Sequence, residues 1–315
     1  MSKIAFIYPG QGAQKAGMGV DFYENSEIAR YIFDQAGEEL DLDMKELCFE
    51  ENDRLDLTEY TQAAMVTTCL AMTRVAESKG LKADITAGLS LGEYPAIAAA
   101  GGMNDMDAIR LVRKRGILMQ NTVPAGEGAM CAVISMAAEE IEKVIEPIAD
   151  VSVANYNCPG QIVITGKTDA VEEAAAKLKE AGARRTIMLN VSGPFHSQML
   201  VPAGEKLAEE LEHTRFHELR IPYVTNVTAE KVTDIRETPG LLTTQISSPV
   251  RWMQSMERMI ADGVDTFVEI GPGKTLEGFL RKIDRSVKVF HISQWEDVDK
   301  VCTELADSGK MMEEA

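Results

Sequence analysis

The chain has 315 residues, of which 45% are hydrophobic and 26% are charged, and this composition is that of an ordinary globular protein. Its net charge of −18 argues against binding to nucleic acid through a general field of basic side chains. No stretch is apolar over the length that a membrane span requires, and the N-terminal apolar run is too short for a secretory signal. The five scattered cysteines include no C-x-x-C pair, which argues against a disulfide framework or a zinc site. We therefore expect a cytoplasmic protein.

Apolar runs alternate with helical patterns along the first part of the chain. We expect strands at residues 4–8 and 84–88, and helices at about 61–79, 91–100 and 106–120. Such alternation predicts an α/β fold with a mostly parallel sheet, of the α/β-hydrolase-like kind.

The middle of the chain changes character and predicts a β-α-β-β-α-β unit, which is the ferredoxin-like arrangement. The expected strands are 129–135, 151–156, 161–165 and 185–189, and the expected helices are 137–146 and 171–181. Turn-forming residues flank the unit on both sides. We therefore predict a small subdomain over residues 122–194, inserted into a catalytic subdomain formed by residues 1–121 and 195–315.

After the insertion the alternation of strands and helices resumes. Helices are expected at about 202–212 and 251–261, and strands at about 222–226 and 266–270. The last five residues, 311–315, are expected to fray.

The most suggestive motif is Gly88-Leu89-Ser90-Leu91-Gly92, which fits G-x-S-x-G. It follows an expected strand and opens an expected helix, which is the context of a nucleophile elbow. A sharp turn of this kind leaves no room for side chains at the flanking glycines. Ser90 is therefore a candidate nucleophile, and the alternative is a plain glycine–serine turn that caps a helix.

A nucleophilic serine needs a base, and the chain has four histidines. His196 lies in an irregular stretch at the predicted subdomain boundary, where clefts form. His213 and His217 are spaced as neighbours on one helical face, and His291 lies in an apolar, strand-like run. By elimination, His196 is the best candidate base.

The loop after the first strand, Pro9-Gly10-Gln11-Gly12-Ala13-Gln14, admits three interpretations. A dinucleotide-binding loop is disfavoured because Lys15 stands where a third glycine is required. A second interpretation is an oxyanion hole built from the backbone N–H groups of Gln11 and Leu91. The third is a simple strand–helix turn.

Arg115 is the residue that bears most directly on the class of substrate. It shares its helical face with Leu111, Leu118 and Met119, so it stands on an apolar stripe. Such an arginine either pairs with an internal carboxylate or binds a carboxylate of a ligand bidentately. Beside a serine nucleophile, the second case selects a dicarboxylic monothioester such as a malonyl thioester over an acetyl thioester.

Taken together, these features resemble the malonyl-CoA:acyl carrier protein transacylase family of fatty acid synthesis. Seven segments carry the resemblance in matching order along nearly the whole chain. They are residues 8–14, 88–94, 115–120, 155–161, 194–197, 245–252 and 269–274. One position departs from the family, because Leu89 stands where the family usually has histidine.

The resemblance implies a role for each matched residue. Ser90 would be the acylated nucleophile, His196 the general base and acid, and Arg115 the group that holds the free malonyl carboxylate. Gln11 and Leu91 would supply the oxyanion N–H groups, and Gln245 would lie beside the serine–histidine pair. A backbone carbonyl rather than an aspartate would orient the histidine.

The expected reaction is a ping-pong transfer of malonyl from malonyl-CoA through a Ser90 ester to acyl carrier protein. It would require no cofactor and no metal. Transfer of another carboxyacyl group in polyketide-type synthesis, a serine thioesterase or hydrolase, and a non-catalytic docking module are the alternatives. Because carrier proteins are acidic, we expect a basic rim, for which Arg184, Arg185, Lys274 and Lys282 are candidates.

Overall fold

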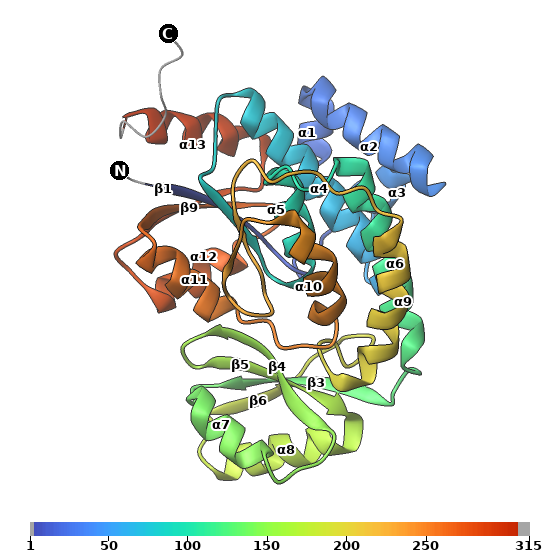
Figure 1. Ribbon diagram of the computed structural model, residues 1–315, viewed down its shortest axis with the longest axis vertical. Helices are drawn as coiled ribbons and strands as arrows, with labels where there is room; N and C mark the ends of the chain where they lie inside the picture. Colours follow the sequence, from blue (N-terminus) through green and yellow to red (C-terminus); the bar gives the residue numbers. More distant parts are fainter. Residues whose placement is uncertain (1–2, 308–315) are drawn as a thin grey trace.

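The computed structural model describes residues 3–307, and its larger part is built on one six-stranded sheet (Figure 1). The strand order is β10-β9-β1-β2-β7-β8, in which only β8 runs antiparallel to its neighbour. The strands are β1 (Lys3–Tyr8), β2 (Ile85–Gly88), β7 (Tyr223–Val224), β8 (Lys231–Val232), β9 (Val264–Ile270) and β10 (Lys288–Ile292). The central strands β1 and β2 are buried on both faces, as expected for a parallel sheet covered by helices.

Helices cover this sheet and carry most of its core. They are α1 (Val20–Asn25), α2 (Glu27–Leu40), α3 (Met44–Phe49), α4 (Thr58–Ser78), α5 (Glu93–Ala99), α6 (Asp105–Thr122), α9 (Val201–Glu212), α10 (Thr238–Gln245), α11 (Trp252–Ala261), α12 (Thr275–Ile283) and α13 (Trp295–Asp307). Three 3₁₀ turns join them, η1 (Ser90–Gly92), η2 (Gln198–Leu200) and η3 (Ile235–Glu237). The long helix α4 is buried over most of its length, so it forms an interior layer of this part of the fold.

A second, antiparallel sheet lies at the lower end of the molecule in Figure 1. Its strand order is β4-β5-β3-β6, formed by β3 (Gly128–Ile134), β4 (Val151–Cys158), β5 (Gln161–Lys167) and β6 (Arg185–Met188). Helices α7 (Ala138–Ile145) and α8 (Thr168–Glu180) pack on one face of it around a separate apolar core. The β-α-β-β-α-β order is confirmed, whereas the exact subdomain boundaries stay a prediction.

The two sheets are joined beside the site described below. The backbone N–H of Tyr156 on β4 donates to the Val250 carbonyl at 2.9 Å, and the Val250 N–H donates to the Ala154 carbonyl at 2.8 Å. The segment that leads into α11 therefore runs alongside β4 and fixes the small sheet against the large part of the fold.

The structure corrects two details of the sequence analysis. The strand expected at 222–226 is only Tyr223–Val224, because Thr225 and Asn226 turn away to form part of the site. The placement of His213 and His217 on one helical face was wrong, because α9 ends at Glu212. Residues 311–315 lie outside the described residues. Within residues 3–307, no helix has both the length and the apolar character that crossing a bilayer would require.

Candidate active site

A strained turn presents Ser90 at the end of β2. Ser90 adopts a left-handed backbone conformation with φ of 53°, at the start of η1. A Cβ atom on Gly88 would lie 1.9 Å from the backbone of Gly92, and a Cβ on Gly92 would lie 2.2 Å from the Tyr8 carbonyl oxygen. Only glycine fits at these two positions, which explains the G-x-S-x-G pattern in physical terms.

Gly92→Ala is therefore expected to lower the free energy of unfolding by about 3 kcal/mol, because backbone atoms of β1 would have to move. Thermal denaturation followed by circular dichroism measures this effect. Gly278→Ala is the matched control, because a Cβ there meets nothing within 4 Å and the helical position favours alanine. A Gly92→Ala protein as stable as this control would contradict the explanation of the turn.

Ser90 and His196 form a hydrogen-bonded pair. Ser90 Oγ lies 2.7 Å from His196 Nε2, although the two residues are 106 positions apart in sequence. On the other side of the ring, His196 Nδ1 lies 2.9 Å from the backbone carbonyl oxygen of Gln245. That oxygen can only accept, so Nδ1 carries the proton and Nε2 is free to take one from Ser90. The orienting group expected from the family resemblance is thus present as a backbone carbonyl.

The surroundings of His196 keep its imidazole neutral. The side chain is buried, and burial together with the nearby Arg115 charge lowers its pKa from the usual 6.5 to about 4. Hydrogen bonds to the backbone of Gln245 and Ser248 oppose this shift. His196 is therefore in the base form at neutral pH.

The rate of Ser90 acylation at saturating acyl-CoA should accordingly show no inflection near pH 6.5. Only neutral His196 can accept the Ser90 proton. Because its pKa is lowered, the acylation rate should fall only as pH approaches about 4. Rapid-quench measurement of acyl-enzyme across this range tests the prediction. A tenfold loss of rate per pH unit below about 6.5 would show an imidazole of ordinary basicity and contradict it.

Arg115 is buried in contact with the pair but has no ionic partner among residues 3–307. It is 1% exposed, and none of the ion pairs in this part of the chain involves it. Its guanidinium donates to Gln62 Oε1 at 2.9 Å and Gln245 Oε1 at 3.1 Å, and it lies 3.4 Å from Ser90 Oγ. Burial lowers the pKa of this guanidinium. An arginine held in this way offers its charge to an anion that enters beside Ser90.

Gln245 connects the arginine, the histidine and the serine. Besides the contacts already described, its Nε2 donates to the Ser90 carbonyl at 2.9 Å and to Glu93 Oε2 at 2.7 Å. The side chain is 1% exposed, so these bonds are shielded from water. Gln245 thus lies where the family resemblance implies, and it is the centre of the polar network.

Two residues of this network were missed by the sequence analysis. Asn226 accepts from the Ser90 N–H at 2.6 Å and donates to the Gly88 carbonyl at 2.6 Å. Glu93 is fully buried and accepts from the Asn226 N–H at 3.1 Å. The signal for Glu93 was a single acidic residue in a helix of otherwise small and apolar residues, but Asn226 gave no comparable signal.

A cavity of about 640 Å³ opens onto the pair. Gln11, Leu89, Ser90 and His196 line it, together with residues of β3, β4 and α12. Leu91 is buried directly behind Ser90, at the start of a helical turn, where backbone N–H groups lack helical partners. Of the six predicted site residues, Gln11, Ser90 and His196 line the cavity. Arg115 and Gln245 contact Ser90 from the buried side, and Leu91 follows it in the turn.

Comparison with known proteins gives matches over nearly the whole chain. The model of the acyl transferase domain family matches residues 5–298. A malonyl CoA-acyl carrier protein transacylase of Bacillus subtilis is 44% identical over 304 residues, which are 95% of this chain and 96% of the relative.

Solved structures also match this chain over nearly its whole length. The malonyl CoA-acyl carrier protein transacylase of Clostridium perfringens superposes with a TM-score of 0.94 at 42% identity, covering 98% of both chains. A malonyl-transacylase in complex with a type II PKS acyl-carrier protein superposes with a TM-score of 0.93 at 35% identity, over 96% of this chain and 100% of that one.

Proposed function

Because the chain belongs to the acyl transferase family, we propose that it transfers malonyl from malonyl-CoA to the phosphopantetheine thiol of acyl carrier protein. The observation that carries this proposal is a buried arginine, without an ionic partner among the described residues, that lies 3.4 Å from the hydroxyl of a histidine-bound serine. A serine–histidine pair alone can transfer any acyl group, whereas the arginine favours acyl groups that carry a free carboxylate.

In the first half-reaction, Ser90 Oγ attacks the thioester carbonyl while its proton passes to His196 Nε2. The tetrahedral oxyanion accepts hydrogen bonds from the Gln11 and Leu91 backbone N–H groups. The intermediate then collapses, the carbon–sulfur bond breaks, and the leaving thiolate of CoA takes the proton from His196. A malonyl ester on Ser90 remains, with its free carboxylate paired to Arg115.

In the second half-reaction, the carrier thiol enters by the same cavity and gives its proton to His196 as it attacks the ester. Collapse of the second intermediate returns the proton to Ser90 Oγ and releases the malonyl carrier. Each step is assigned to groups of this chain and needs no cofactor.

Since CoA thioesters are its substrates and its cysteines are free thiols in residues 3–307, the proposed compartment is the cytoplasm.

Hydrolysis and transfer differ in the group that discharges the ester. We test the proposal by following CoA release from malonyl-CoA with and without holo acyl carrier protein. A transferase releases CoA in proportion to the carrier that it loads. A hydrolase releases CoA at the same rate when the carrier is absent, and that result would overturn the proposal in favour of a thioesterase.

The preferred acyl group is a second part of the proposal. Methylmalonyl and other carboxyacyl groups also carry the carboxylate that Arg115 would bind, so polyketide-type acyltransfer is the alternative. Leu89 lines the cavity with an apolar surface at the position before the nucleophile. Competition between malonyl-CoA and methylmalonyl-CoA for acylation of Ser90 decides between these substrates.

For the carrier, we propose a basic rim formed by Arg184, Arg185, Lys274 and Lys282. All four are exposed, and none forms an ion pair with another residue of the described chain. Reversing these charges should raise the KM for carrier at low salt and leave acylation by malonyl-CoA unchanged. An unchanged KM for carrier would contradict the assignment of this rim.

A further inference from the structure

We propose that Glu93 is a positioning residue for acyl transfer, whose carboxylate holds Gln245 and Asn226 and through them orients His196, Arg115 and the Ser90 turn. The inference rests on the proposed function, because it concerns the same reaction. Glu93 touches none of the groups that react, so it acts through the residues that it holds and through its charge.

The hydrogen bonds of Glu93 converge on one oxygen. Oε2 accepts from Gln245 Nε2 at 2.7 Å and from the Asn226 backbone N–H at 3.1 Å. The other oxygen, Oε1, is buried and meets no donor at normal hydrogen-bond geometry within residues 3–307. These two hydrogen bonds come from separate segments, one after β7 and one at the end of α10, and the Thr225 side chain also interacts with the carboxylate.

Each of those two residues holds a different part of the site. Gln245 presents its backbone oxygen to His196 Nδ1 and its side-chain oxygen to Arg115. Asn226 holds the two ends of the strained turn, through the Ser90 N–H and the Gly88 carbonyl. Loss of the Glu93 carboxylate would free both partners at once, and small misplacements of reacting groups cost large factors in rate.

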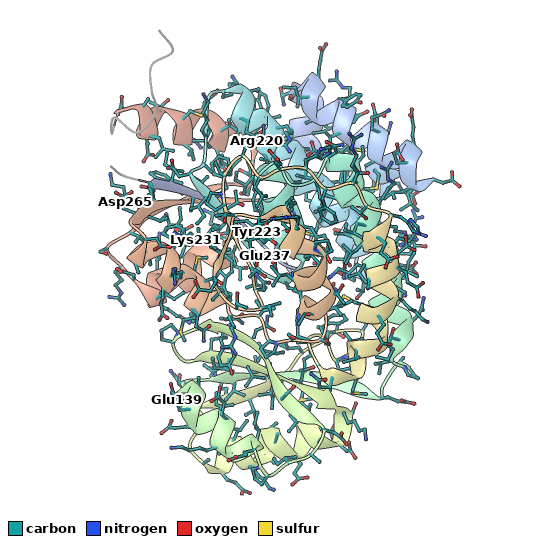
Figure 2. All side chains as sticks on the ribbon, viewed as in Figure 1. Glu139, Arg220, Tyr223, Lys231, Glu237 and Asp265 are labelled. Carbon is teal, nitrogen blue, oxygen red and sulfur yellow. The ribbon has the colours of Figure 1, made fainter. Side chains whose placement is uncertain are left out.

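The charge of Glu93 has a second consequence for Arg115. Burial raises the pKa of this carboxyl to about 7, against the lowering effects of its hydrogen bonds and of Arg115. The other titratable groups that face it are Tyr94 on the same helix and Tyr223 on β7, which is labelled in Figure 2. As pH rises through about 7, Glu93 ionises, partly neutralises Arg115 and weakens its attraction for a malonyl carboxylate.

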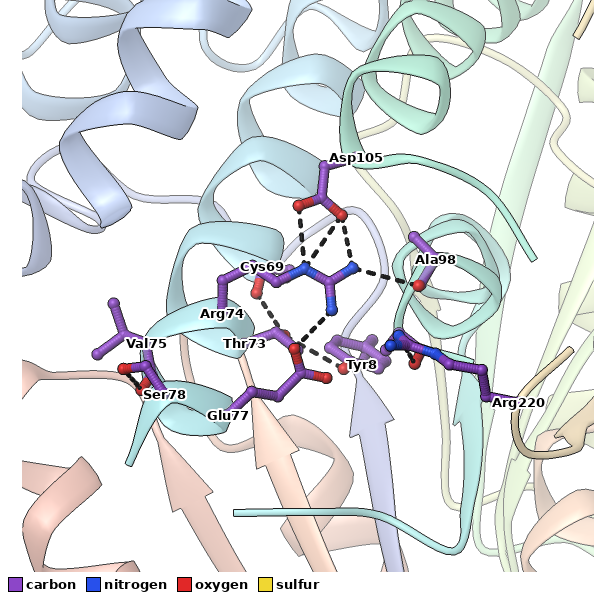
Figure 3. A network of polar contacts seen from close by, with 11 residues as sticks. Tyr8, Cys69, Thr73, Arg74, Val75, Glu77, Ser78, Ala98, Asp105 and Arg220 are labelled. Atoms are coloured by element: carbon purple, nitrogen blue, oxygen red, sulfur yellow. Dashed lines mark hydrogen bonds and ion pairs between the residues drawn. The ribbon is translucent and has the colours of Figure 1, made fainter. Parts of the chain in front are cut away.

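The experiment compares Glu93→Ala and Glu93→Gln with wild type and with a control of similar thermal stability. Asp105→Asn is the control, because Asp105 binds Arg74 at the far end of α6 in the separate network of Figure 3. The readouts are the melting temperature, the single-turnover rate of Ser90 acylation at saturating malonyl-CoA, and the KM for malonyl-CoA across pH.

We expect Glu93→Ala to slow acylation roughly 10- to 100-fold at temperatures where its circular dichroism is native. Glu93→Gln keeps one acceptor oxygen and should stay within about fivefold of wild type. Asp105→Asn should lower the melting temperature and leave acylation unchanged. A folded Glu93→Ala protein that acylates at the wild-type rate would overturn the proposal.

If Glu93→Ala does not fold, the pH dependence of the KM for malonyl-CoA in Glu93→Gln tests the proposal instead. In wild type the KM for malonyl-CoA should rise about threefold or more as pH passes from about 6 to 8.5, and in Glu93→Gln this rise should vanish. The same rise in both proteins would overturn the proposal. Wild type that forms no malonyl ester at all would instead contradict the proposed function, so the two failures are distinguishable.

Discussion

Replacing His196 by alanine is expected to slow the acylation of Ser90 by malonyl-CoA about 10³-fold. The reason is that no other base lies at hydrogen-bond distance from Ser90 Oγ within residues 3–307. Its neighbours there are His196 Nε2 at 2.7 Å and the Arg115 guanidinium at 3.4 Å, and a guanidinium cannot accept a proton. Rapid-quench mass spectrometry of the acyl-enzyme measures the rate.

The remaining rate should depend on hydroxide, because direct ionisation of the serine replaces transfer of its proton to the imidazole. His291→Ala is the matched control, since His291 lies on β10 beside Glu277 and Asp297 and contacts no residue of the network. Acylation by His196→Ala at more than about a tenth of the wild-type rate would contradict the assignment of His196 as base.

Replacing Arg115 by alanine is expected to lower kcat/KM for malonyl-CoA by roughly 10²- to 10³-fold. A malonyl carboxylate that enters this buried site without Arg115 would lose its cationic partner while remaining out of water. Acetyl-CoA has no such carboxylate, so its kcat/KM should stay within about threefold of the wild-type value. The ratio of the two constants therefore reports the specificity that Arg115 contributes.

Two further variants sharpen this test. Arg115→Lys should restore little of the preference, because Gln62 and Gln245 are bound by two different nitrogens of the planar guanidinium and the compact ammonium group lacks this spread. Arg110→Ala, which removes an arginine from the outer face of the same helix where it pairs with Glu39, should leave both substrates unchanged. Equal losses for malonyl-CoA and acetyl-CoA in Arg115→Ala would contradict a role in recognising the carboxylate.

Much of this arrangement could be predicted from the sequence, because local rules decide it. The glycines of the Ser90 turn, the apolar face that carries Arg115 and the β-α-β-β-α-β order all follow from spacing within one segment. The helices that the sequence analysis did not predict are α1, α2, α3, α10, α12 and α13. Of these, α1 and α3 have only six residues each, too few to establish a clear helical period.

The network behind the pair could not be predicted in this way. Gln245 and Glu93 are 152 positions apart, and Asn226 and Ser90 are 136 apart, so their contacts depend on the packing of separate segments. Gln245 was found only through the family resemblance. Its backbone oxygen orients His196. Every residue has such an oxygen, so the residue type at position 245 could not reveal this role.

Intact-protein mass spectrometry after brief mixing with malonyl-CoA, in wild type and in Ser90→Ala, shows whether Ser90 carries a malonyl group on its way to a carrier protein. We expect a malonyl adduct on wild type alone, which disappears when holo acyl carrier protein is added and reappears as malonyl carrier. An adduct that also forms on Ser90→Ala, or one that the carrier leaves in place, would exclude Ser90 as the group that passes malonyl to the carrier.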